Sequence, residues 1–313
     1  MKKWIKVLLC IVLAAVLAVG GYVAYVFIDY HRIGDMPLTP VRSADAAAAL
    51  ETDTPYAVLS WNIGFGAYES DYGFFMDGGT ESRAWSRERL TANMDAVASL
   101  VKAQDADFTL LQEVDMNATR TYHVDEREVL YAALFDRSSV FCQNYDSPYL
   151  MYPVTKPHGA SQSGLLTFSA AQIGDARRVE LPVEPGFRKL LDLDRCYSVT
   201  RIPVDNGKTL CLYDLHLSAY TSDGKIADEQ LEMLLADMQQ EYENGNYVVG
   251  GGDFNKDLLG NSGYAGGVRR RELVRGCRRL QQGSPGGFLR VFRRVGHGLC
   301  MGAAHPGGYL RRL

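Results

Sequence analysis

The first long apolar stretch of the chain contains no charged residue. Residues 1–6 carry three lysines, and residues 7–28 are then 22 positions without a charge. A helix of this length crosses a bilayer. Lysines before such a span favour a single-pass protein with its N-terminus in the cytoplasm and the rest of the chain outside. A cleaved signal peptide is the alternative, with small residues at Ala15 and Ala18, but the apolar run continues well past them. We therefore expect an uncleaved anchor over residues 1–28.

The pattern changes after the anchor. Residues 29–54 combine prolines, an alanine run and scattered charges, which is typical of a tether. Beyond residue 55, short apolar runs alternate with longer amphipathic stretches, and the folded domain is expected to begin there.

Several elements of that domain are marked by local signals. Ser86 is expected to cap a helix that continues to about residue 104, because apolar residues recur behind it at helical spacing. Asn206-Gly207 between two apolar runs predicts a β-hairpin. Further helices are predicted over 126–136 and 225–243. The predicted strands cover 56–62, 107–113, 164–169, 196–204, 208–217 and the apolar run 247–249.

The predicted strand over 247–249 is followed by candidate chemistry. Three glycines, Gly250 to Gly252, precede Asp253, and Asn255 follows two residues later. Glycine allows a sharp turn or a close approach to a ligand. A carboxylate can accept a proton from a water molecule, and a neighbouring amide can donate to a developing anion. A glycine-rich turn capped by Asp and Asn is the alternative interpretation.

Other polar residues end predicted strands upstream. Asn62 ends the strand over 56–62, Glu113 ends the next one, and His216 lies in the second strand of the hairpin. Each of these residues alone is more often solvated or structural than catalytic. Together they come from several strand ends, which is how α/β scaffolds assemble sites. Gly64 and Gly66 lack the third glycine of a dinucleotide fingerprint, which disfavours a nucleotide-binding oxidoreductase.

Four motifs in sequence order closely resemble the endonuclease/exonuclease/phosphatase superfamily: Trp61-Asn62-Ile63-Gly64, Leu111-Gln112-Glu113, His216-Leu217 and Gly252-Asp253-Phe254-Asn255. The resemblance covers about residues 55–260. It implies an α/β (α+β) fold, a four-layer sandwich of two mixed sheets flanked by helices, here preceded by one transmembrane helix. It also implies hydrolysis of phosphate esters with Mg²⁺ or Mn²⁺.

The resemblance assigns a role to each motif residue. Asn62 and Glu113 match the metal ligands, and oxygen donors of this kind suit magnesium. Asp253 matches the residue that orients or deprotonates the attacking water, and Asn255 matches the amide that stabilises the transition state. His216 would donate to a phosphate oxygen. The substrate could be nucleic acid, a phospholipid head group or a small phosphoester, and no protein partner is inferred.

Charge divides the chain into two parts. The net charge is -4, but residues 264–313 carry 11 Arg, no Lys and one acid, Glu272, for a net of +10, which leaves -14 for residues 1–263. The acidic part argues against a broad, sequence-independent grip on nucleic acid. We predict four segments: the anchor, the linker over 29–54, the domain over 55–263 and the Arg/Gly-rich tail.

The tail departs from the family pattern. Family members close with a Ser-Asp-His motif, whereas neither His297 nor His305 follows an Asp. A shifted reading frame in a GC-rich gene is favoured over a genuine basic tail for nucleic acid or anionic lipid, because the tail replaces the end of the domain. We therefore expect the last strands to be missing, a sheet edge to be unpaired and hydrolysis to be impaired. A non-catalytic extracytoplasmic binding module on the same fold is the alternative function.

Six cysteines are scattered without the spacing of a zinc site or a dense disulfide framework. The hairpin register keeps Cys196 and Cys211 from facing each other. Most of the cysteines are therefore interpreted as buried thiols.

Overall fold

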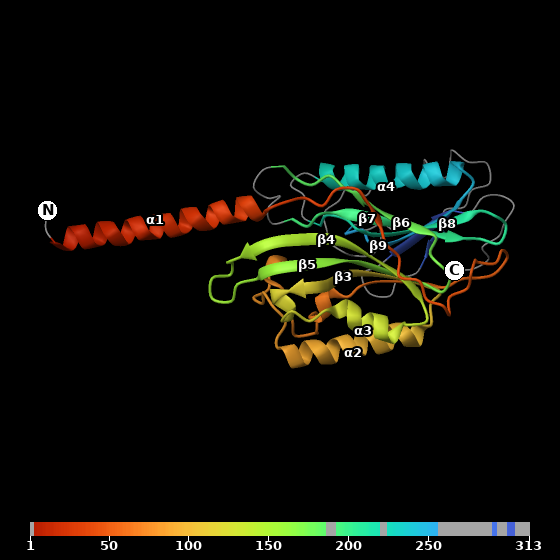
Figure 1. Ribbon diagram of the computed structural model, residues 1–313, viewed down its shortest axis with the longest axis horizontal. Coiled ribbons are helices and arrows are strands. Elements are labelled where there is room, and N and C mark those ends of the chain that lie inside the picture. Colours follow the sequence, from red (N-terminus) through yellow and green to blue (C-terminus); the bar gives the residue numbers. More distant parts are fainter. Residues whose placement is uncertain (1–2, 186–191, 220–223, 256–289, 293–298, 304–313) are drawn as a thin grey trace.

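The computed structural model describes residues 3–185, 192–219, 224–255, 290–292 and 299–303, and the structural statements below concern these residues. Two stacked sheets form the body, with α4 on one outer face and α2 and α3 on the other (Figure 1). This is the predicted four-layer sandwich.

Both sheets are mixed. The smaller one contains, in order, β2 (Val58–Asn62), β3 (Phe108–Ala118), β5 (Gly159–Ser169) and β4 (Ser138–Leu150). Its β2 and β3 are parallel and its other pairs are antiparallel. The larger one contains β1 (Met36–Leu38), β6 (Asp175–Glu180), β7 (Cys196–Pro203), β8 (Thr209–His216), β9 (Tyr247–Asp253), β11 (Leu299–Ala303) and β10 (Arg290–Phe292). Here β8 and β9 are the parallel pair.

The helices form where the apolar periodicity predicts them. They are α1 (Lys3–Asp29), α2 (Arg87–Gln104), α3 (Glu126–Ala133), α4 (Lys225–Glu243) and the short 3-10 turns η1 (Gly64–Gly66), η2 (Phe75–Asp77) and η3 (Thr119–Thr121). The Ser86 hydroxyl accepts a hydrogen bond from the Arg89 N–H at 3.2 Å, so it caps α2 as expected. α4 covers the predicted range, and α3 ends three residues earlier than predicted.

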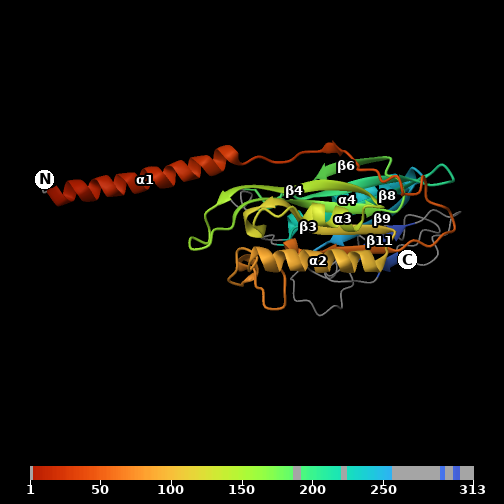
Figure 2. The same cartoon turned by 60° about the horizontal axis from the view of Figure 1, so that its bottom comes forward.

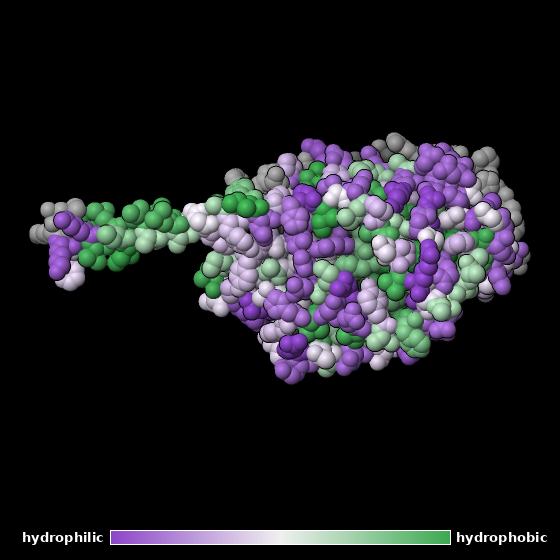
Figure 3. All heavy atoms as spheres, viewed as in Figure 1, coloured by the Kyte–Doolittle hydropathy of each residue, from purple (hydrophilic) through white to green (hydrophobic). Residues whose placement is uncertain are grey.

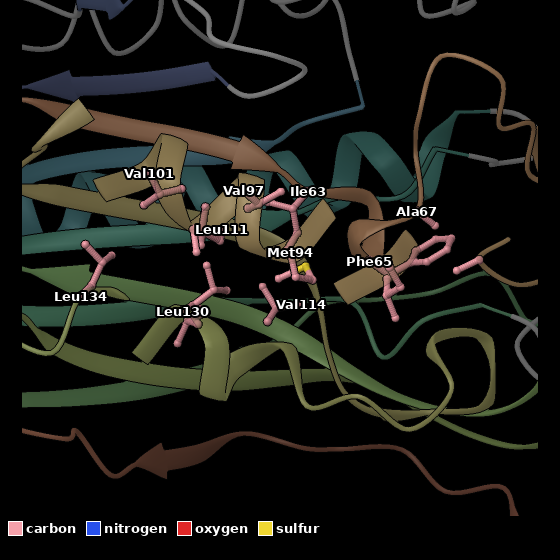
Figure 4. Packing of buried hydrophobic residues seen from close by; sticks show 14 of the residues in the cluster. Ile63, Phe65, Ala67, Met94, Val97, Val101, Leu111, Val114, Leu130 and Leu134 are labelled. Carbon is pink, nitrogen blue, oxygen red and sulfur yellow. The ribbon is translucent and has the colours of Figure 1, made fainter. Parts of the chain in front are cut away.

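Three large apolar clusters hold the layers together. The first lies between α2, α3 and the smaller sheet, where Met94, Leu111 and Leu130 are fully buried (Figure 4). The second joins α4 to the larger sheet, and the third lies between the two sheets. Each fully buried Leu or Met contributes roughly 1.5–3 kcal/mol relative to an exposed side chain.

The segment over 29–54 is not the free tether that its composition predicts. Its β1 pairs with β6, and the Leu50 N–H donates to the Pro203 carbonyl at 2.8 Å. Ala46 and Leu50 are also buried. The segment packs on the domain because these apolar side chains have partners there, which composition alone does not reveal.

β4 and β6 were also not expected from the sequence, and β3 and β5 extend beyond the predicted ranges. β4 is rich in polar residues, and its pairing with β5 shifts register between Gln143 and Tyr145 and again between Ser147 and Leu150. Each shift interrupts the alternation of buried and exposed positions, so the period of two is hidden in the sequence.

The expectation that the larger sheet ends at β9 with an unpaired edge is wrong. β11 pairs antiparallel with β9, and β10 pairs with β11. The ladder is formed by backbone N–H and C=O groups, so a segment of low strand propensity can still complete it. His297 and His305 lie outside the described residues.

Strand register confirms that Cys196 and Cys211 do not face each other, since Cys211 pairs with Arg201. The neighbour of Cys196 is instead Cys142 on β4, with their Sγ atoms 3.5 Å apart in the buried space between the sheets. The structure describes both as free thiols.

α1 projects from one end of the body, and apolar residues cover most of its surface (Figure 3). It has 27 residues and is long and apolar enough to cross a membrane. A signal sequence would share this length and composition.

Candidate active site

Asn62 lies at the centre of the candidate site, at the end of β2. Its Nδ2 donates to Glu113 Oε1 and to Asp253 Oδ2, each at 2.9 Å, and its Oδ1 accepts from the Gly64 N–H at 2.9 Å. β2 and β3 belong to the smaller sheet, whereas Asp253 comes from β9 of the larger one. One amide therefore joins two carboxylates from different sheets.

The prediction that Glu113 ends a strand is wrong, because β3 continues to Ala118. The residue lies instead in a bulge: the register shifts between Leu111 and Val114, and Glu113 has a φ of +57°. A bulge breaks the alternation of the pleat and re-aims a side chain. This local distortion directs the Glu113 carboxylate toward Asn62.

Asp253 and Asn255 are held by the end of β9. Asp253 Oδ1 accepts from the Asn255 N–H at 2.9 Å, and Asn255 Nδ2 donates to the Leu217 carbonyl at 2.8 Å. The preceding glycines lie inside β9 and not in a turn. Gly252 has a φ of +146°, and a Cβ there would lie 2.0 Å from the Leu215 oxygen, so a close approach of β8 requires glycine.

His216 ends β8 directly beside Asp253 in the strand register. Its Nε2 lies 3.9 Å from Glu113 Oε1 and 4.0 Å from Asp253 Oδ2. Burial lowers the pKa of His216 to about 3, with a further contribution from the charge of Arg195. The imidazole is therefore neutral at pH 7, and a neutral ring can donate one hydrogen bond.

Burial raises the pKa of Glu113, and the charge of Asp253 raises it further, against the opposing effects of Arg120, the Asn62 hydrogen bond and Arg195. Two carboxylates that share one neutral amide donor leave negative charge that a cation would stabilise. All the oxygen donors are hard, as Mg²⁺ and Mn²⁺ require.

The metal prediction fits these residues in part. Within the described ranges, no three or more His, Cys, Asp or Glu side chains form a group that could hold a metal ion. Magnesium needs only one or two carboxylates, with water and substrate as its remaining ligands, so Glu113 suits it. Asn62 directs its nitrogen toward both carboxylates. The predicted ligand atom, Oδ1, instead accepts a hydrogen bond from the Gly64 N–H.

Two buried arginines beside the site were not expected from the sequence. Arg195 Nη1 donates at 3.0 Å to the Leu217 carbonyl, which also accepts from Asn255. Arg120 makes two hydrogen bonds to the Asp115 carboxylate and lies over the Phe65 ring at 3.8 Å. No local sequence pattern identifies a buried arginine, because its partners lie elsewhere in the chain.

A buried hydrogen-bonded link ties the two sheets together behind the site. Gln112 Nε2 donates to Asp214 Oδ1 at 2.7 Å, and the Thr167 hydroxyl donates to Asp214 Oδ2 at 3.1 Å. Gln112 precedes Glu113, and Asp214 lies two residues before His216. The link therefore fixes β3 against β8 next to both site residues.

The structure thus brings Asn62, Glu113, His216, Asp253 and Asn255 into one connected group between the two sheets of an α/β sandwich. This fold is that of a class of phosphoesterases. The chain belongs to the Endonuclease/Exonuclease/phosphatase family, whose sequence model matches residues 59–301. The match continues past residue 263, where the domain was expected to end.

Solved structures of low similarity to this chain were also found. A protein described as an endonuclease/exonuclease/phosphatase from Beutenbergia cavernae is 20% identical, with a TM-score of 0.46, and the match covers 64% of this chain and 47% of that one. ANGEL2, a 2′,3′-cyclic phosphatase, is 20% identical, with a TM-score of 0.43, and the match covers 71% of this chain and 56% of that one. The human Nocturnin catalytic domain is 17% identical, with a TM-score of 0.46 and coverages of 86% and 86%.

The chain therefore spans about half the length of the first two of these structures. No curated protein matches it.

Proposed function

We propose that this chain is a divalent-metal-dependent hydrolase of phosphate esters. The observation that supports this most directly is the amide of Asn62, which is hydrogen-bonded to both Glu113 and Asp253 while His216 lies within 4.0 Å of both carboxylates. A general base, a neutral hydrogen-bond donor and hard oxygen ligands are then available within one small site.

Each residue has a role in this proposal. Asp253 orients the attacking water and accepts its proton, and its own orientation is maintained by the Asn255 N–H and the Asn62 amide. His216 donates from its neutral ring to a phosphate oxygen. The Asn255 side chain, positioned through the Leu217 carbonyl, stabilises the transition state next to Asp253.

Glu113 is the proposed metal ligand, with Asn62 beside it. Asn62 directs its amide oxygen toward Glu113 only if the oxygen and nitrogen exchange places, which would give up the hydrogen bonds to both carboxylates and the one from Gly64. When bound, Mg²⁺ or Mn²⁺ supplies positive charge that offsets the charge developing on the phosphate oxygens and assists the leaving group.

Substrates of three kinds fit the proposal: nucleic acid, a phospholipid head group or a small phosphoester. The net charge of -14 over residues 1–263 disfavours extensive contacts to a phosphate backbone. We further propose that activity is impaired, because no Ser-Asp-His sequence occurs in residues 264–313.

The test compares two proteins: the chain as given, and a corrected chain whose reading frame is restored after about residue 260. Both are assayed for hydrolysis of bis(p-nitrophenyl) phosphate with Mg²⁺ or Mn²⁺ and with a chelator. We expect metal-dependent turnover by the corrected chain and a much lower rate for the chain as given. Equal turnover by both would show that the tail is native, and no turnover by either would favour the non-catalytic binding module.

The proposed location is the outer face of a membrane, because three lysines precede the uncharged run over 7–28 and the domain follows it. Protease added to intact cells that express the chain is therefore expected to remove the domain and to leave a protected fragment of α1. A cytoplasmic protein of the same cells is the control for intact membranes. Full protection of the domain would contradict this topology.

A further inference from the structure

The end of β4 contacts α1 through two tyrosine side chains. Tyr22 Oη donates to the Tyr149 carbonyl at 3.2 Å and accepts from the Met151 N–H at 3.0 Å. Tyr25 Oη accepts from the Tyr149 N–H at 3.0 Å. These three bonds place the β4 end beside the body of α1, since Tyr22 lies seven residues, or about 10 Å, before Asp29.

The aromatic residues of α1 indicate where the bilayer lies along it. Trp4 and Tyr25 are 21 residues apart, which is about 30 Å along a helix and matches the thickness of the hydrocarbon core. Tryptophan and tyrosine concentrate at the two membrane–water interfaces. If Trp4 marks one interface, Tyr22 and Tyr25 mark the other, and the end of β4 lies at head-group level.

The connection from β4 to β5 continues from this point. We define the β4–β5 tip as residues 151–157. It contains no acidic residue and one lysine, although the chain up to residue 263 has a net charge of -14. Its apolar side chains are open to solvent: Met151 is 52% exposed, Tyr152 is 67% exposed and Val154 is 83% exposed.

Two views agree on the position of the tip. The β4–β5 connection is the part of the body that extends furthest along α1 toward the N-terminus (Figures 1 and 2). Apolar surface is also visible at this end of the body, next to α1 (Figure 3). Contiguous exposed apolar patches mark interaction sites, membrane contacts among them.

We propose that the β4–β5 tip is a second membrane contact, which inserts Met151, Tyr152 and Val154 into the interfacial region of the same bilayer that α1 crosses. This inference rests on the proposed membrane anchor. A lipid surface is favoured over a second protein because the backbone of Tyr149 and Met151, where β4 ends and the tip begins, is hydrogen-bonded to the part of α1 that reaches the bilayer interface. The proposed partner of the tip is therefore the bilayer, because α1 holds the tip beside it.

The tip is also joined to the loops around the site. The ring centroids of Phe75 and Tyr152 lie 5.7 Å apart, the Ser82 hydroxyl donates to the Lys156 carbonyl, and Arg83 Nε donates to the Pro157 carbonyl. These contacts hold the tip against the segment that follows η1. A membrane contact at the tip would therefore fix the orientation of the site relative to the bilayer.

The direction of β3 indicates which end of the sandwich the site faces. β3 runs from Glu113 toward Thr119, which packs against Gly159 at the start of β5. β2 is parallel to β3, so Asn62 ends its strand in the same direction. The site and the β4–β5 tip therefore face the same end of the sandwich.

The experiment places a photo-crosslinking amino acid, benzoylphenylalanine, at one position at a time in the full chain reconstituted in phosphatidylcholine vesicles. Val154 tests the tip, and Leu17, in the apolar part of α1, reports on the anchor. Phe135 is the matched control, because it is 68% exposed but precedes the start of β4. The 13 residues of β4 place it about 40 Å from the tip.

We expect lipid adducts at positions 17 and 154 and none at position 135. Lipid adducts at position 17 with none at position 154, or with adducts of a second protein chain there, would overturn the β4–β5 contact and leave the anchor intact. Absence of lipid adducts at position 17 would overturn the anchor and this inference together. The phosphodiester assay is independent of all three outcomes.

Discussion

Replacement of Asp253 by Asn in the corrected chain is expected to lower kcat for a phosphodiester by roughly 10²- to 10⁴-fold, the range for a lost general base. The Asn side chain has nearly the same size, so the end of β9 should keep its backbone structure. The amide of the D253N side chain cannot accept a proton from water at pH 7. An amide nitrogen in place of Oδ2 would also face the Nδ2 donor of Asn62, with no acceptor between the two donors.

The measurement is the rate of bis(p-nitrophenyl) phosphate hydrolysis against substrate concentration, with kcat and KM determined separately. KM is expected to change little, because the lost interaction belongs to the transition state. Asp136→Asn is the matched control, since Asp136 is a partly exposed acid that lies 3.7 Å from Arg137, away from the site. If D253N and the control react at the same rate, Asp253 is not the base.

Replacement of Glu113 by Gln should remove the charge that holds the cation and keep the shape of the side chain. We expect the rate of the corrected chain to fall by at least ~100-fold, the scale for loss of a charge-stabilising group. The metal concentration needed for half-maximal activity should rise as well. The amide oxygen of the E113Q side chain can still accept the hydrogen bond from Asn62, so a structural loss is not expected to mask the effect.

A second readout does not depend on activity. The chain as given should be stabilised against thermal unfolding by Mn²⁺, because binding to the folded state alone raises its stability. This stabilisation should disappear in E113Q and persist in the control Glu128→Gln, an exposed acid on α3. An unchanged rate together with an unchanged metal titration would make Glu113 a purely structural residue.

The larger elements of the fold could be predicted from the sequence because their signals are local. α4 follows from one apolar stripe, α2 from a stripe and the Ser86 cap, and the β7–β8 hairpin from Asn206-Gly207. The candidate site could also be selected, since each of its residues lies in a short motif within or directly after a strand. Whether these five residues perform catalysis remains a prediction.

The sequence by itself thus determined the apolar N-terminal helix, the other helices, most strands and the types of chemistry in the four motifs, because period, caps and turns act over a few residues. Only the tertiary structure decided the bulge that directs Glu113 to Asn62, the polar strand β4 and the pairing of β11 with β9. It also decided the burial of Arg120 and Arg195 beside the site. These features depend on register and on partners far away in the chain, and a register shift of one residue changes which face a side chain occupies.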